Sequence, residues 1–270
     1  MIQYEILPVE LVLYMIGFAL LLASLAPKYR PMRRVGFWFV LSGYFLSSLG
    51  LIEWGVVGKH VPWSNFYETL LMVSWLLVGG SFLAAWRFRT ALLFLGTLPV
   101  AGAMVLFAMM LPPVYSELTP LAPTLRSHWL LVHVPLVLAS YAAFIIAAGA
   151  SAMYLIKERS RGSTEFLPPL ETLDMLNYAG VALGVVMMIS GVIMGAIWAM
   201  RTWGTYWQWD AKESAAFITI IIYVIALHLR HFRDWKGSRL AWLSLAGFLM
   251  VIFTHIASNF LTSGLHSYAK

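Results

Sequence analysis

The strongest constraint on the fold of this chain is a series of eight apolar stretches. Each is about long enough to cross a bilayer. A transmembrane helix needs roughly 20 mostly apolar residues, and such stretches lie near residues 9–26, 35–52, 66–85, 91–111, 129–155, 176–200, 214–230 and 240–262. Charged side chains make up only 11% of the sequence, whereas they form about a quarter of an ordinary globular domain. We therefore predict an all-α, polytopic membrane helix bundle of about eight transmembrane helices, with residues 1–270 forming a single domain.

The basic residues predict the orientation of this bundle. Eight spans place both termini and three loops on one side of the membrane, and four loops on the other. The four-loop side holds 13 of the 18 Lys and Arg residues, and the other side holds Lys59, Arg126, Arg201, Lys212 and Lys270. Because cytoplasmic loops carry an excess of Lys and Arg, we expect both termini to lie outside. The net charge of +6 then reflects topology, and no nucleic-acid partner is expected.

The connection between the sixth and seventh spans, at about residues 198–214, is rich in tryptophan. Its notable side chains are Trp203, Trp207, Trp209 and Asp210. A single tryptophan is usually an interfacial anchor, but three in seven residues exceed what anchoring requires, and flat indoles suit a flat apolar ligand. An acid followed three residues later by Glu213, just before an apolar run, also predicts a capping box at the start of a helix.

Two histidines are expected at the height of this tryptophan-rich loop. His133 lies about one turn inside the outer end of the fifth span, and His266 follows the outer end of the eighth. Ionisable groups within membrane spans are costly and are functional hypotheses by default. Two neutral imidazoles at one height can supply both axial ligands of haem iron. The cations expected on the same side, which can meet the haem propionates, are Arg126, Arg201 and Lys212.

The roles of the other histidines are predicted from their expected depth in the membrane. His228 falls at the inner end of the seventh span, a membrane thickness from the tryptophan-rich loop. Either it snorkels toward the basic inner loop, or it is one ligand of a second, inner site that is completed elsewhere. His255, about two turns inside the eighth span, is interpreted as a core histidine, whereas His60 and His128 are expected to be solvated in outer loops.

Five segments of the chain carry a recognisable pattern. They are GKHVPWSNFYETLLMVSW (58–75), SHWLLVHVPLVLASYAAF (127–144), WGTYWQWDAKES (203–214), ALHLR (226–230) and GLHSY (264–268). In this order they resemble the CcsA (ResC) family of System II cytochrome c maturation, within the tryptophan-rich (WWD domain) haem-handling proteins. Two positions depart from the family pattern. Ala211 replaces the usual proline of the signature, and Arg201 stands where an acidic residue is expected just before the loop.

The resemblance implies a haem export and presentation subunit of a holocytochrome c synthase (haem lyase), in the bacterial cytoplasmic (inner) membrane or in the thylakoid membrane if plastid-encoded. It implies that His133 and His266 ligate an external haem b beside the WWD loop. It implies also that His228 ligates a haem within the membrane whose second ligand comes from the partner CcsB (ResB). Haem vinyl groups then form thioethers with the cysteines of a Cys-x-x-Cys-His motif in apocytochrome c, with a thiol reductant system as a further partner. The chain contains no cysteine, so the thiols must come from the substrate.

Three other functions remain open. A System I CcmC-like haem chaperone would pass haem to a carrier protein, but WDAKES and GLHSY favour the synthase subunit. A b-type cytochrome electron-transfer subunit would need histidine pairs on facing helices at both depths, and His228 has no evident mate in this chain. A transporter of another flat aromatic ligand would show no haem absorbance.

Overall fold

The computed structural model describes residues 3–118, 121, 123–160 and 166–257, and these parts contain helices and no strands. Eight helices in this described part are long and apolar enough to cross a membrane. The helices are α1 (Gln3–Ala23), α2 (Met32–Gly58), α3 (Phe66–Phe88), α4 (Phe94–Met110), α5 (His128–Arg159), α6 (Leu170–Trp203), α7 (Ala211–Arg233) and α8 (Ser238–Ile252). Adjoining helical turns extend the fourth span to Ala91–Met110 and the eighth to Ser238–Ile256. Each helix overlaps one predicted span, so the prediction of an all-α bundle with eight spans is confirmed.

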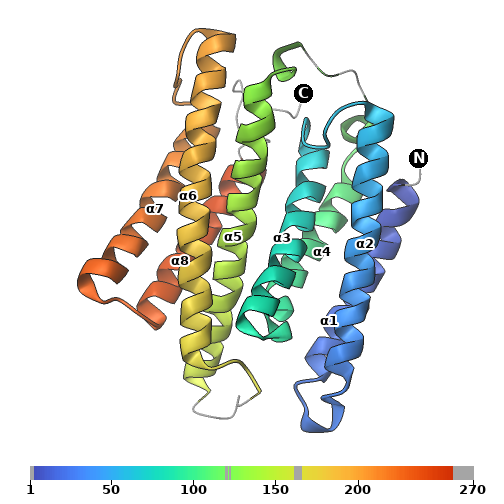
Figure 1. Ribbon diagram of the computed structural model, residues 1–270, viewed down its shortest axis with the longest axis vertical. Coiled ribbons are helices and arrows are strands. Elements are labelled where there is room, and N and C mark those ends of the chain that lie inside the picture. Colours follow the sequence, from blue (N-terminus) through green and yellow to red (C-terminus); the bar gives the residue numbers. More distant parts are fainter. Residues whose placement is uncertain (1–2, 119–120, 122, 161–165, 258–270) are drawn as a thin grey trace.

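The helices run alternately up and down, so their connections collect at two ends of the bundle (Figure 1). The α1–α2, α3–α4, α5–α6 and α7–α8 connections lie at the lower end in this view, and the other three lie at the upper end. The loops with most of the basic residues therefore share one end, as the charge pattern requires. The assignment of that end to the inner side of the membrane, and of both termini to the outer side, stays a prediction.

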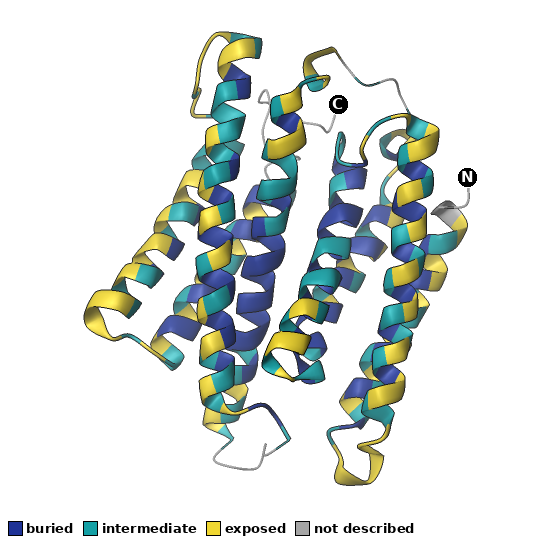
Figure 2. Cartoon of the chain, in the orientation of Figure 1, coloured by how far each residue is buried: buried dark blue, intermediate teal, exposed yellow. Residues whose placement is uncertain are grey.

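Helix α5 lies at the centre of the bundle and packs against α3, α4, α6 and α8. Every residue from Ser140 to Ser151 is buried, and this run is visible as continuous dark blue in Figure 2. Small residues allow the close packing, because a Cβ atom added to Gly96 of α4 would lie 2.8 Å from the Cα atom of Gly149. Close backbone approach at small residues is a usual way for helices to associate in lipid.

A charged pair fixes the α7–α8 end of the bundle to α6. The Arg230 guanidinium donates to both carboxylate oxygens of Asp174, at 3.1 and 2.8 Å. The backbone amide of Gly237 also donates to Asp174, at 2.9 Å. The side chains of the charged pair are only 11% and 14% exposed, so one carboxylate joins α6, α7 and the connection to α8.

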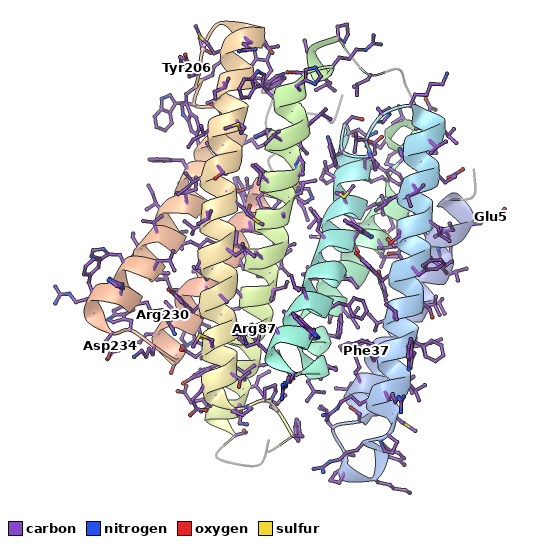
Figure 3. The ribbon with its side chains drawn as sticks, in the orientation of Figure 1. Glu5, Phe37, Arg87, Tyr206, Arg230 and Asp234 are labelled. Carbon is purple, nitrogen blue, oxygen red and sulfur yellow. The ribbon has the colours of Figure 1, made fainter. Side chains whose placement is uncertain are left out.

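Replacing Asp174 with alanine is expected to destabilise the bundle by roughly 3 kcal/mol, because it leaves a poorly solvated guanidinium without its counter-charge. The measurement is thermal unfolding in detergent. Asp234, which forms an ion pair with Lys236 in the same region, is the matched control because its side chain is 82% exposed. Arg230 and Asp234 are labelled near each other in Figure 3. Asp234→Asn removes this charge and keeps a residue type that tolerates the left-handed backbone found here (φ 52°), so it should leave the melting temperature unchanged. A loss equal to that of Asp174→Ala would contradict the assignment.

Candidate functional site

His133 is held in a defined orientation by the neighbouring helix. Its ring Nδ1 lies 2.7 Å from the carbonyl oxygen of Gly191 on α6. A carbonyl can only accept, so Nδ1 carries the proton and the lone pair of the imidazole is on Nε2. A hydrogen bond of this kind fixes the tautomer and the ring orientation of metal-ligating histidines. The His133 ring is therefore held in the tautomer and orientation in which Nε2 can ligate a metal.

Glycines on α6 make room for this ring. Gly191 and Gly195 are four residues apart and lie on one face of α6, the face that packs against α5. A Cβ atom on Gly195 would lie 2.6 Å from both Cε1 and Nδ1 of His133. A methyl group at this position must therefore move the imidazole, which the hydrogen bond to Gly191 otherwise fixes.

Gly195→Ala is expected to lower the affinity of the protein for haem by about tenfold. This is the lower end of the loss seen when the contacts that support a metal-ligating histidine are disturbed. The measurement is a spectroscopic titration of the purified protein with haem. Gly102→Ala on α4 is the control, because its added Cβ atom would meet only Leu11 Cδ1, at an ordinary 3.5 Å. Equal affinities in the two variants would show that the close approach at Gly195 does not matter.

A pocket extends inward from His133, beneath the connection between α6 and α7. The space between its lining residues amounts to about 920 Å³ when the open solvent at its mouth is counted. Tyr141, eight residues further along α5, lines the inner part, so the pocket extends about 12 Å along that helix. We call this space the tryptophan-loop pocket; its walls include Trp63, His133, Tyr141, Met188, Trp207 and Lys212.

The three tryptophans singled out in the sequence take different positions. Trp207 lines the pocket. Trp203 is the last residue of α6 and packs edge-on against Trp198, with ring centroids 4.5 Å apart. Trp209 is 67% exposed and meets Trp207 edge to face, at 5.7 Å. Of the three indoles expected to form a wall, one therefore lines the pocket, a second contacts that one, and the third packs at the end of α6.

The start of α7 has the predicted cap. The Asp210 side chain accepts a hydrogen bond from the backbone amide of Glu213, at 2.7 Å. The Glu213 carboxylate reaches back past the cap residue and accepts from the backbone amide of Gln208, at 2.8 Å. Both acids therefore shape the loop that holds Trp207, and Tyr206 marks this loop in Figure 3.

The α2–α3 connection also contributes to the wall of the pocket and is organised around a buried carboxylate. Glu68 is 1% exposed and accepts hydrogen bonds from Trp54 Nε1, Ser64 N, Ser64 Oγ and Asn65 Nδ2, at 2.9, 2.6, 2.8 and 3.1 Å. Its own amide donates to Asn65 Oδ1, at 2.8 Å, which caps α3. This network fixes the short segment that carries Trp63, Ser64 and Asn65 into the pocket.

His60 belongs to the same network, so the expectation that it is solvated was wrong. Its side chain is 6% exposed, and its Nε2 lies 3.8 Å from Glu68 Oε1. The connection folds back on the carboxylate and covers the ring, which the spacing of residues along the chain does not reveal. His128, by contrast, is exposed as expected.

His255 is buried as expected, but it also lines the tryptophan-loop pocket. It lies in a π-helical turn, Phe253–Ala257, that continues α8. Its ring lies 5.4 Å from that of Tyr141 and 5.9 Å from that of Phe66, measured between centroids. The sequence signal was its depth of about two turns inside the eighth span, but the packing of α8 against α5 is needed to bring it close to Tyr141.

The remaining candidates lie away from this pocket or outside the described residues. Arg201 packs over the Trp129 ring at 4.9 Å, and Arg126 donates to the Leu121 carbonyl at 3.1 Å. His228 is exposed on α7, sixteen residues or about 24 Å from Lys212 along the helix axis, with its ring 4.6 Å from that of Phe232. His266 lies outside the described residues. The structure therefore brings His133, Trp207 and Lys212 together and does not bring Arg126, Arg201 or His228 to them.

Comparisons with known proteins match most of the chain. The family model described as "Cytochrome C assembly protein" matches residues 63–266. A cytochrome c biogenesis protein CcsA of Prochlorococcus marinus (strain MIT 9215) is 34% identical over 255 residues, which cover 85% of this chain and 82% of that protein. The CcsA protein of Guillardia theta is 35% identical over 234 residues, 77% of each. Both relatives are similar to this chain over most of their own length.

Two further comparisons involve longer proteins. Protein NrfI of Wolinella succinogenes is 35% identical over 278 residues, which cover 99% of this chain but only 30% of NrfI. The solved structure of a protein described as "Cytochrome c Heme Lyase CcmF" superimposes with a TM-score of 0.68 at 16% sequence identity, covering 98% of this chain and 47% of that one. At this identity the likeness concerns the fold, which the two chains share.

Proposed function

The chain belongs to the CcsA family of cytochrome c assembly proteins, and on that basis we propose that it is the haem export and presentation subunit of a System II holocytochrome c synthase. In this function it is a haem-handling subunit of cytochrome c biogenesis that holds haem for attachment to apocytochrome c. The observation that carries the proposal is the tryptophan-loop pocket, where an oriented imidazole, His133, and the indole of Trp207 line the same largely apolar space.

The residues of this pocket fit a haem. Nε2 of His133 carries the lone pair that iron requires, and the second axial ligand we propose is His266. The apolar side chains of α5 and α6 suit the faces of a porphyrin. We propose that this porphyrin is haem b, because the chain has no cysteine to bind a haem covalently. Of the three cations considered for the propionates, we retain Lys212, because it lines the pocket.

Each residue of the site has a role in presentation. Trp207 and its edge-to-face neighbour Trp209 cover the porphyrin, Trp203 stabilises the end of α6, and Asp210 caps α7 and so sets the shape of the loop. When bound, haem supplies vinyl groups, and each substrate thiol adds its sulfur and its hydrogen across one vinyl double bond. Holding haem and apoprotein together makes this encounter effectively intramolecular. The thiols come from the Cys-x-x-Cys-His motif of apocytochrome c, kept reduced by a thiol reductant system.

We propose a second role for His228 at the other end of α7, as one ligand of a haem that enters within the membrane. Its side chain is exposed on the bundle, close to Phe232, so a helix of a second protein can reach it. The partner that would supply the second ligand is CcsB (ResB). The proposed location is the bacterial cytoplasmic membrane, or the thylakoid membrane for a plastid-encoded chain.

The proposal is tested in a bacterial host that lacks its own cytochrome c maturation. The chain is co-expressed with a CcsB-type partner and a reporter apocytochrome c, and covalent haem is stained after denaturing electrophoresis. The expected result is holocytochrome c only when both membrane proteins are present. Covalent attachment without this chain would overturn the proposal, and haem binding without any attachment would instead favour a chaperone of the CcmC type.

A further inference from the structure

One residue that lines the tryptophan-loop pocket carries a buried hydrogen-bond donor with no acceptor in the described part of the chain. This donor is the indole Nε1 of Trp207, whose solvent access is closed by its surroundings. Buried polar atoms in folded proteins nearly always have a hydrogen-bond partner, and an indole N–H can only donate. A ligand that completes this site is therefore expected to bring an acceptor atom to Trp207.

A cation faces the same space. Lys212 is the second residue of α7 and lines the pocket together with Ala216, which lies one helical turn further on the same face. Its ammonium group offers three donors and a compact positive charge. Charge-assisted hydrogen bonds to a carboxylate are about twice as strong as neutral ones, so an anionic oxygen is the acceptor that Lys212 favours.

The two acids of the loop are part of its backbone hydrogen bonding. Glu213 also lines the pocket, and its carboxylate accepts from the backbone amide of Gln208. Asp210 accepts from the backbone amide of Glu213. The donors that this loop and the start of α7 contribute to the lining of the pocket include the indole N–H of Trp207 and the ammonium group of Lys212.

We propose that Lys212 and Trp207 Nε1 together bind a propionate carboxylate of the haem and thereby set the orientation of the porphyrin. This inference rests on the proposed function. The propionates lie on one edge of the macrocycle and the vinyl groups lie on the other. With the propionate edge held at the start of α7, the vinyl edge lies on the side of the macrocycle away from Lys212 and Trp207.

The test compares haem with haem dimethyl ester, in which both carboxylates are neutralised, by absorbance titration of the purified protein. Wild type is expected to bind haem about tenfold more tightly than the ester, as one charge-assisted contact implies. Lys212→Met should lose this preference, and Trp207→Phe, which keeps the aromatic ring but removes the N–H, should reduce it. Lys59→Met is the control, since Lys59 is exposed and does not line this pocket, and it should discriminate like wild type.

The outcomes distinguish the propionate assignment from the proposed haem-handling function. Equal affinity of wild type for haem and its ester would overturn the propionate assignment and leave the proposed function intact. Full discrimination by Lys212→Met would also overturn the assignment. Binding of neither porphyrin by wild type would overturn the proposed function together with the inference. The wild-type comparison does not depend on the folding of any variant.

Discussion

Replacing His133 with alanine is expected to lower the haem content of the purified protein by at least about tenfold, the scale on which metal sites respond when even a supporting contact is lost. The physical reason is the loss of the Nε2 lone pair that the hydrogen bond to Gly191 orients. The remaining haem should change from a low-spin to a high-spin spectrum because one axial ligand is missing. The measurement is the haem-to-protein ratio together with the visible absorption spectrum.

Free imidazole provides an internal check on the His133 variant. The alanine leaves space beside Gly195, so added imidazole should enter and restore a low-spin spectrum. His128→Ala is the matched control, because His128 is an exposed residue near the start of the same helix and does not line the pocket. Unchanged haem content in His133→Ala would move the assignment to another imidazole at the pocket, of which His255 is the one in the described part.

Replacing Glu68 with leucine is expected to give the largest loss of stability, at least about 3 kcal/mol, because several donors lose their acceptor and some stay buried. Among them are the indole N–H of Trp54, a fully buried residue, and the groups of Ser64 and Asn65. The α2–α3 connection should then lose its shape, and with it the wall that carries Trp63. We expect a lower melting temperature in detergent and weaker haem binding in the same variant.

Two further variants make this result specific. Glu68→Gln keeps one acceptor oxygen and should lie between wild type and the leucine variant in both measurements. Glu117, in the α4–α5 connection, is an exposed acid, and Glu117→Leu should change neither. A Glu68→Leu protein that melts like wild type would show that the network around this carboxylate does not hold the connection.

The sequence was sufficient for the spans because apolar length alone determines which segments can cross a bilayer. It was also sufficient for the cap at Asp210, which depends on residues only three positions apart. The family resemblance is confirmed by the matching family model and the CcsA relatives. Each of these features is determined by residues close together in the sequence or by the order of motifs along the chain.

The shape of the site was not predictable in the same way, because it depends on contacts between segments far apart in sequence. Trp203 looked equivalent to Trp207, but α6 continues as far as Trp203, whose ring packs on Trp198. His60 looked solvated until the α2–α3 connection was seen to fold around Glu68. His255 reaches the pocket only through the π-helical turn after α8 and the packing of α8 on α5.

The most direct test of the central claim is the visible absorption spectrum of the protein purified with its haem, recorded for wild type and for the His133→Ala, His266→Ala double variant. Our account predicts a low-spin, bis-histidine haem spectrum in wild type that is absent from the double variant. A low-spin haem spectrum of the same intensity in the double variant would contradict the assignment of these two histidines and of the tryptophan-loop pocket as the haem site.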